Sequence, residues 1–378
     1  MITKATFTWL ISFVFASAPA ATSPSAPANP RANAQARALL HYFQRLSTRA
    51  DRRVVSGQFT DVGRDASVAL MNTVHEQTGH WPALLGADYG DFVTGSLTVR
   101  EPNQAALAYW RQGGLVSLSA HLYNPANPKG FGLRDKGVNL DDLLQPGTAT
   151  HQRWMQELNL LATGLRELKE AGVVVLWRPF HEMNGDWFWW GGKDPEAFIK
   201  VWRHMFDYFS RTRGLDNLLW VYAPNQGPDT ARYYPGDRYV DLVGLDAYTD
   251  WVDRQHIQGY DELAALPKPF GFAEYGPHDA EHPPGDYDYR RFIAGIVKHF
   301  PKTTFFMAWN TNWSLARNNH SRALLEHPWV ITRTHLPPGL VTSPWGQWGK
   351  NQPGRERAED GSFKAESKRS TGFGFTRR

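Results

Sequence analysis

The 378-residue chain contains no cysteine. It can therefore form no disulfide bridge, offers no thiol nucleophile and has no cysteine-ligated metal site. Its stability must come from a hydrophobic core, which a chain of this length with 42% hydrophobic residues can supply. The length alone would suggest two or three domains, but α/β barrels reach this size as one domain.

Three motifs of common protein classes are also missing. The chain has no G-x-S-x-G pentapeptide, which argues against a serine hydrolase. The first predicted strand-to-helix turn, residues 58–63, lacks the G-x-G-x-x-G pattern of dinucleotide-binding folds. His181-Glu182 begins an H-E-x-x-H zinc motif, but Gly185 stands where the second histidine should be. We therefore expect no metal and no cofactor.

The body of the chain carries no large excess of either charge. The formal charge is +4, and residues 350–378 alone hold eight Lys and Arg against four Asp and Glu. We expect no nucleic-acid partner, and we interpret residues 337–378 as a basic, disordered tail. Electrostatic attachment of this tail to an anionic cell-surface polymer is an alternative. A monomer is expected.

The N-terminus has the features of a secretory signal peptide over residues 1–20. Lys4 provides the positive start, Phe7–Phe15 is apolar, and Ala18-Pro19-Ala20 offers a cleavage site. The apolar stretch is too short to span a bilayer, so we expect no stable membrane insertion. These features predict a secreted or periplasmic protein, with a Pro- and Ala-rich linker over residues 21–33 before a folded domain at 34–336.

From residue 53 onward, short apolar runs alternate with amphipathic segments. Five of the segments between the runs predict helices: Ser67–Thr78, Asn103–Gln112, Gln152–Glu170, Pro195–Thr212 and Tyr287–His299. The runs predict eight strands: Val54–Phe59, Ala83–Asp88, Leu115–Ala120, Val173–Trp177, Leu218–Tyr222, Leu242–Leu245, Phe270–Ala273 and Thr304–Ala308. Such alternation indicates parallel strands covered on both faces. We predict the α/β fold of a (β/α)8 TIM barrel, with a doubly wound open sheet as the alternative.

Two glutamates follow apolar strands of this predicted barrel. Glu182 follows the fourth strand and Glu274 the seventh, at the ends where barrel enzymes bind their ligands. A carboxylate at such a place needs a reason, because an unpaired buried charge is unfavourable. One reason is an ion pair with Arg178. The other is catalysis, because glutamates on opposite sides of a barrel can face each other across its mouth, as in retaining glycosidases.

Four aromatic residues, Trp187 to Trp190, come shortly after Glu182. Side chains of neighbouring residues diverge, so these rings cannot all point into one core. We expect some of them to face the barrel mouth, where the apolar faces of sugar rings can stack, and one or two to pack inside.

These segments together resemble glycoside hydrolase family 26, the β-mannanases and their relatives. The resemblance spans about Val54 to Trp313, in the same order along the chain. The matching segments are Trp177–Gly185, Trp187–Gly191 and Phe272–Gly276, with further matches at Val55–Gln58 and Gly244–Tyr248.

The resemblance implies a retaining endo-β-glycosidase that hydrolyses β-1,4-mannan by double displacement. It makes Glu182 the general acid/base and Glu274 the nucleophile. It further implies a set of substrate-binding residues with Arg178 in support: His121, His181, Trp187, Tyr248 and Trp309. His181 would bind hydroxyls near the cleavage point, Tyr248 would orient the nucleophile, and Trp309 would form the floor of a sugar subsite.

Two further expectations concern ionisation and substrate. We expect Arg178 and Tyr248 to keep Glu274 ionised, and nearby rings and the charge of Glu274 to raise the pKa of Glu182. Mixed-linkage β-glucan and β-1,3-xylan remain alternative substrates. A barrel that binds carbohydrate without cleaving it is the alternative that involves no catalysis.

Overall fold

The computed structural model describes residues 26–341, apart from residue 131 and residues 279–282. The predicted signal peptide 1–20, the first part of the predicted linker and most of the predicted tail lie outside the described residues. In the part of the chain that is described, no helix combines the length and the apolar character needed to cross a bilayer.

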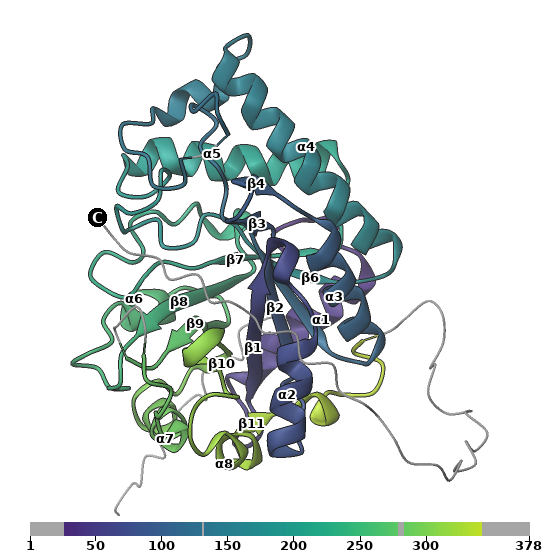
Figure 1. Ribbon diagram of the computed structural model, residues 1–378, viewed down its shortest axis with the longest axis vertical. Coiled ribbons are helices and arrows are strands. Elements are labelled where there is room, and N and C mark those ends of the chain that lie inside the picture. The colour runs from purple at the N-terminus through teal and green to yellow at the C-terminus, as the bar shows by residue number, and fades with distance from the viewer. Residues whose placement is uncertain (1–25, 131, 279–282, 342–378) are drawn as a thin grey trace, which may run out of the picture. The chain divides into compact units, whose positions relative to one another are not determined.

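Eight parallel strands form a closed barrel (Figure 1). The last strand pairs back with the first, with Phe305 opposite Val55 and Ala308 opposite Gln58. All eight apolar runs therefore form strands, and the predicted barrel is confirmed over the open sheet. In order around the barrel the strands are β1 (Val54–Val62), β2 (Leu84–Asp88), β5 (Leu115–Ser119), β6 (Val175–Arg178), β7 (Leu218–Tyr222), β8 (Leu242–Tyr248), β9 (Phe270–Gly276) and β10 (Thr303–Ala308).

The barrel interior is packed rather than open. A Cβ atom on Gly271 would lie 2.3 Å from the ring of Phe305, and one on Gly86 would lie 2.8 Å from the sulfur of Met307. Glycine at these two strand positions lets larger side chains from β10 fill the centre of the barrel. The close packing fixes the strands, and so fixes the residues at their C-terminal ends.

Helices cover most of the barrel from outside. Thr148 and Asp194 cap two of them, because their side chains accept hydrogen bonds from the backbone of His151 and Ala197. The α-helix predicted to run to Thr212 ends at Asp207, and the chain continues as a π-helical turn over Tyr208–Thr212. The helices after β1 are α2 (Ala69–Thr78), α3 (Arg100–Arg111), α4 (Ala149–Glu170), α5 (Pro195–Asp207), α6 (Tyr260–Ala264), α7 (Tyr289–His299) and α8 (Ser321–Glu326).

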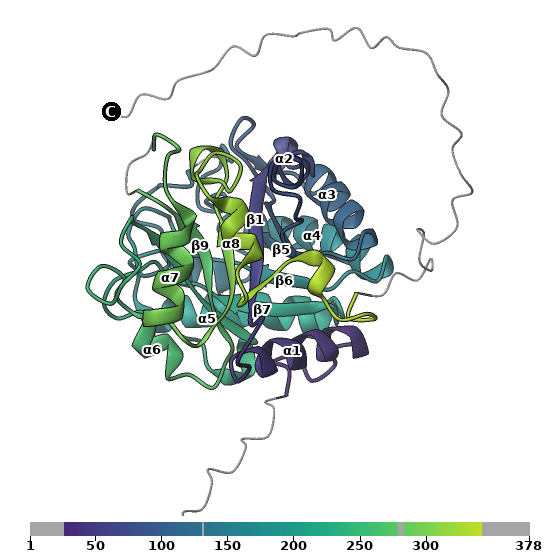
Figure 2. The ribbon, with the colours of Figure 1, turned by 90° about the horizontal axis from the view of Figure 1, so that it is seen from below.

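Two short elements and the N-terminal segment complete the described fold. β11 (Val330–Ile331) pairs with the start of β1, and the hairpin of β3 (Gly90–Asp91) and β4 (Ser96–Leu97) follows β2. Figure 2 shows α1 (Ala34–Leu46) beside β7.

The backbone just before α1 is tied to the barrel. Ala28 donates to the carboxylate of Asp241 (2.7 Å), and Asn33 donates to the carbonyl of Asp216 (2.8 Å). The latter part of the predicted linker therefore packs against the barrel.

Candidate active site

Glu182 lies in a strained turn directly after β6. Phe180 and Glu182 both have left-handed backbones, with φ of 50° and 56°. This conformation costs a residue other than glycine about 1–2 kcal/mol. The turn persists because the Phe180 ring is buried against Trp189 and Trp190, and the Glu182 amide donates to the carbonyl of Ala223 (2.8 Å).

The carboxyl of Glu182 is held by Trp187. The indole Nε1 of Trp187 donates to Oε2 of Glu182 at 2.6 Å. Burial and the charge of Glu274 raise the pKa of Glu182 to about 7, although this hydrogen bond and Arg178 oppose the rise. A carboxylic acid with such a pKa is still largely protonated in weakly acidic solution, as a general acid must be.

Glu274 lies in β9 and is held from two sides. Tyr248, at the end of β8, donates from its hydroxyl to Oε2 of Glu274 at 2.7 Å. Arg178 forms an ion pair with the other oxygen, Oε1, and its second nitrogen donates to Asp246 Oδ2 at 2.9 Å. Burial opposes the charge of Arg178, but Asp246 and Glu274 outweigh it and raise the pKa of the guanidinium. Glu274 is therefore fixed in position and electrostatically supported as a carboxylate.

Three carboxyl groups meet at this point. One oxygen each from Glu182, Asp246 and Glu274 lie within 4.8 Å of one another. This spacing resembles the roughly 5–5.5 Å between the carboxyls of retaining glycosidases, and is below the roughly 6.5–9.5 Å of inverting ones. By distance alone the three oxygens could surround a cation, but the Arg178 guanidinium already binds two of the carboxylates.

The aromatic loop after Glu182 is mostly core. Phe188, Trp189 and Trp190 are buried, and only Trp187 stays partly exposed. We expected one or two of the four rings to pack inside, and three do. Phe188 stacks on Trp190, and both indoles have hydrogen-bond partners: Trp189 donates to the carbonyl of Leu122 and Trp190 to that of His181, each at 2.8 Å. Hydrogen-bonded indoles can be buried at little cost.

The other predicted binding residues, His121, His181 and Trp309, differ in how exposed their side chains are. His121 and His181 are both buried, with their Nε2 atoms 3.0 Å apart. His181 is only 1% exposed and lies against Phe188. Trp309 is partly exposed and stacks on Phe59, with ring centroids 3.9 Å apart. The Trp309 amide donates to the carbonyl of Tyr275, the residue after Glu274, at 2.9 Å, so the partly exposed indole lies after β10, the strand next to β9.

Three aspartates near the site carry no role predicted from the sequence. Asp88 contacts His121, Asp246 binds Arg178, and Asp61 accepts a hydrogen bond from Asn310 at 3.2 Å. Burial raises the pKa of Asp61. Asp88 and Asp246 both end or nearly end apolar strands, which is the signal that pointed to the two glutamates.

Known proteins match this chain over most of its length. The model of the family described as glycosyl hydrolase family 26 matches residues 28–335. A mannan endo-1,4-beta-mannosidase of Bacillus subtilis (strain 168) is 37% identical over 356 residues, which cover 89% of this chain and 97% of the relative. "Mannan endo-1,4-beta-mannosidase A and B" of Caldalkalibacillus mannanilyticus is 36% identical over 328 residues, 82% of this chain and 63% of the relative.

A solved structure agrees as well. The structure of the Bacillus subtilis mannanase man26 has a TM-score of 0.78 at 36% identity, and the match covers 84% of this chain and 98% of that chain. The resemblance inferred from the motifs is therefore confirmed: the chain belongs to glycosyl hydrolase family 26.

Proposed function

We propose that this chain is an endo-acting β-mannanase that cleaves β-1,4-mannan, galactomannan or glucomannan with retention of the anomeric configuration. The observation that carries the proposal is the pair of carboxyls within 4.8 Å whose surroundings differ. Glu182 is a weak acid beside an indole donor, and Glu274 is a carboxylate held by an arginine and a tyrosine. Two such carboxyls perform the two halves of a double displacement.

In the first step, Oε2 or Oε1 of Glu274 attacks the anomeric carbon, and the glycosidic C–O bond breaks. Glu182 gives its proton to the leaving oxygen, so the shortened chain departs as an alcohol. In the second step, Glu182 takes a proton from water, the hydroxide equivalent attacks the anomeric carbon, and the ester to Glu274 breaks. Tyr248 and Arg178 hold the nucleophile in line in both steps.

The functional test is product analysis on three polymers. Galactomannan should be shortened to oligosaccharides with the β-anomer formed first, as seen by proton NMR within the first minutes. Lichenan and β-1,3-xylan should release far less. Release from lichenan or β-1,3-xylan alone would move the chain to a different polymer, and release from none would favour the barrel that only binds carbohydrate.

The nucleophile has its own test. A 2-deoxy-2-fluoro mannoside with a good leaving group should accumulate as a covalent ester, because the fluorine slows both steps whereas the reactive leaving group restores the rate of the first step only. Peptide mapping should find the label on Glu274. A label on any other residue would refute the assignment.

We further propose that the protein is a secreted or periplasmic monomer that acts on external polysaccharide. The signal features of residues 1–20 support export. The N-terminal sequence of the mature protein, expected to begin after Ala20, and its mass by light scattering would test both statements.

A further inference from the structure

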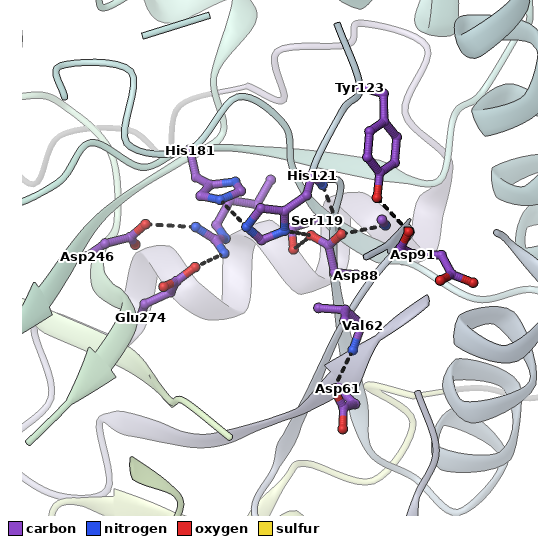
Figure 3. Close-up of polar contacts among 12 residues, drawn as sticks. Asp61, Val62, Asp88, Asp91, Ser119, His121, Tyr123, His181, Asp246 and Glu274 are labelled. Atoms are coloured by element: carbon purple, nitrogen blue, oxygen red, sulfur yellow. Dashed lines mark hydrogen bonds and ion pairs between the residues drawn. The ribbon is translucent and has the colours of Figure 1, made fainter. Parts of the chain in front are cut away.

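A chain of polar contacts links His181, which precedes Glu182 in the sequence, through His121 to the buried Asp88. Asp88 ends β2, whereas His121 and His181 follow β5 and β6 (Figure 3). Nδ1 of His121 lies 3.1 Å from Oδ2 of Asp88, and Nε2 of His121 lies 3.0 Å from Nε2 of His181. All three side chains are more than nine-tenths buried. The contacts are therefore shielded from solvent along their whole length.

Asp88 accepts hydrogen bonds on both oxygens. Oδ1 accepts from the backbone amides of Gly90 (2.6 Å) and His121 (2.9 Å), and Oδ2 accepts from the Ser119 hydroxyl. Burial alone would raise the pKa of Asp88, but His121 and these hydrogen bonds outweigh burial and lower it. An ionised carboxylate only accepts hydrogen bonds, so the facing Nδ1 of His121 must carry a proton.

That proton determines the protonation of the next ring. When His121 carries a single proton, on Nδ1, its Nε2 is an acceptor, so the facing Nε2 of His181 must be the donor. Burial lowers the pKa of His181 well below its ordinary value, so this ring is neutral and carries no second proton. Nδ1 of His181 then carries a lone pair and no proton. Nδ1 of His181 is buried and has no hydrogen-bond partner among the described residues, whereas Nδ1 of His121 lies 3.1 Å from the Asp88 carboxylate but forms no hydrogen bond of regular geometry with it.

We propose that Asp88 is a positioning residue of the active site: through His121 it fixes the tautomer of His181, so that His181 offers Nδ1 as an acceptor next to Glu182. The inference rests on the proposed function, since it gives Asp88 a task in that site. The orientation and tautomer of the two rings can nevertheless be measured without any substrate. Carboxylates behind functional histidines act in this way in other enzymes.

Asp88→Asn provides the test because it replaces a single carboxylate oxygen of Asp88 by an NH2 group. The two backbone amides hold the amide oxygen at the place of Oδ1, so the new NH2 group replaces Oδ2 and faces Nδ1 of His121. That group donates, so His121 must move its proton to Nε2, and His181 must move its proton to Nδ1. The substitution therefore reverses both tautomers while preserving the backbone hydrogen bonds.

The direct measurement is a two-bond ¹⁵N–¹H correlation spectrum of the histidine rings in the full chain at neutral pH. His121→Asn and His181→Asn variants assign the signals. The wild type should show protons on His121 Nδ1 and His181 Nε2, and Asp88→Asn should show both reversed. A wild-type proton on His181 Nδ1, or a doubly protonated His121, would overturn the proposal, and it would do so even if Asp88→Asn failed to fold.

The kinetic measurement uses galactomannan and a matched control. Asp88→Asn should lower kcat/KM by about 10- to 100-fold, mainly through kcat, as substitutions behind functional histidines do. Asp241→Asn makes the same change at a buried carboxylate that also accepts two backbone amides, but before β8, at the opposite end of the barrel. Its kcat/KM should stay within about twofold of the wild type. Reversed tautomers with unchanged kcat would refute the positioning role, whereas absent wild-type activity would refute the proposed function instead.

Discussion

At the scale of single residues, the two glutamates of this site differ in their hydrogen-bond partners. Glu182 has one neutral donor, Trp187, whereas Glu274 has Tyr248 and the charged Arg178. Like charges so close cannot both be ionised at low cost, and the proton stays on the group with the weaker support. The different roles that we propose for the two glutamates therefore follow from their neighbours, since the residues themselves are identical.

The first prediction concerns the acid. Glu182→Ala should reduce kcat/KM on mannan by about 10²–10⁴-fold, the usual contribution of a general acid. An aryl mannoside with an acidic phenol needs no protonation to leave, so its first step should be much less affected. Steady-state and burst kinetics on both substrates measure the difference. An equal loss on the two substrates would contradict the acid role.

The second prediction concerns pH. Glu182 must be protonated to act as the acid, so kcat/KM should fall as the pH rises through about 7. The hydrogen bond from Trp187 stabilises the ionised form and lowers the pKa of Glu182. Trp187→Phe should therefore move this basic limb to higher pH, as measured by a kcat/KM profile from pH 5 to 9.

Trp189→Phe is the matched control for this profile. Its indole donates to the carbonyl of Leu122 and not to Glu182. The basic limb of Trp189→Phe should stay at the wild-type position. A basic limb that Trp187→Phe leaves in place would show that another group sets it.

At the scale of elements, the loop after β6 is a buried support more than a sugar-binding surface. Trp190 is fully buried, stacks on Phe188 and donates to the carbonyl of His181. The loop thus fixes the strained turn that carries Glu182. A stable loop is needed there because the left-handed residues would relax without it.

The third prediction tests this support. Trp190→Ala should lower the free energy of unfolding by about 3–5 kcal/mol, because it removes a large buried ring and leaves a cavity. Chemical denaturation followed by fluorescence or circular dichroism measures the loss. Trp251→Ala, at a tryptophan that is 55% exposed, should change the stability by less than about 1 kcal/mol. Equal losses in the two variants would argue against the packing role.

The sequence predicts this architecture well where a local signal exists. Parallel strands buried on both faces are continuous apolar runs, so all eight were identified. The connection from β7 to β8 contains no α-helix among the described residues, and α6 has five residues, so no helical period was available there. The α-helix predicted over residues 195–212 ends at Asp207. The prediction ran too far because the helical period of apolar residues continues through the π-helical turn at 208–212.

In the site, too, only the features with a local sequence signal were predicted. Each glutamate was singled out because a carboxylate follows an apolar strand. The link from Asp88 through His121 to His181 could not be foreseen, because it joins the end of one strand to the loops after two others, and successive members are 33 and 60 positions apart in the sequence. Which of two neighbouring aromatic rings faces the core also depends on tertiary hydrogen bonds, such as those of Trp189 and Trp190.

At the scale of the whole molecule, one buried carboxylate joins the N-terminal segment to the barrel. Asp241 Oδ1 accepts from the amide of Ala28 (2.7 Å), and Oδ2 accepts from the amide of Trp220 in β7 (2.8 Å). Burial raises the pKa of Asp241 to about 6, although the two hydrogen bonds oppose the rise. The stability of the fold is therefore linked to pH through this group.

The fourth prediction follows from the direction of that shift. The folded chain binds the Asp241 proton more tightly than the unfolded chain, whose pKa is near 3.8. The stabilisation is therefore complete below about pH 4 and is lost as the pH rises through about 6, and the shift corresponds to roughly 3 kcal/mol. Asp241→Asn removes this titration. Urea unfolding of both proteins from pH 4 to 7.5 should show the wild type losing up to that amount relative to the variant, and a difference independent of pH would mean that Asp241 is ionised in the folded chain throughout.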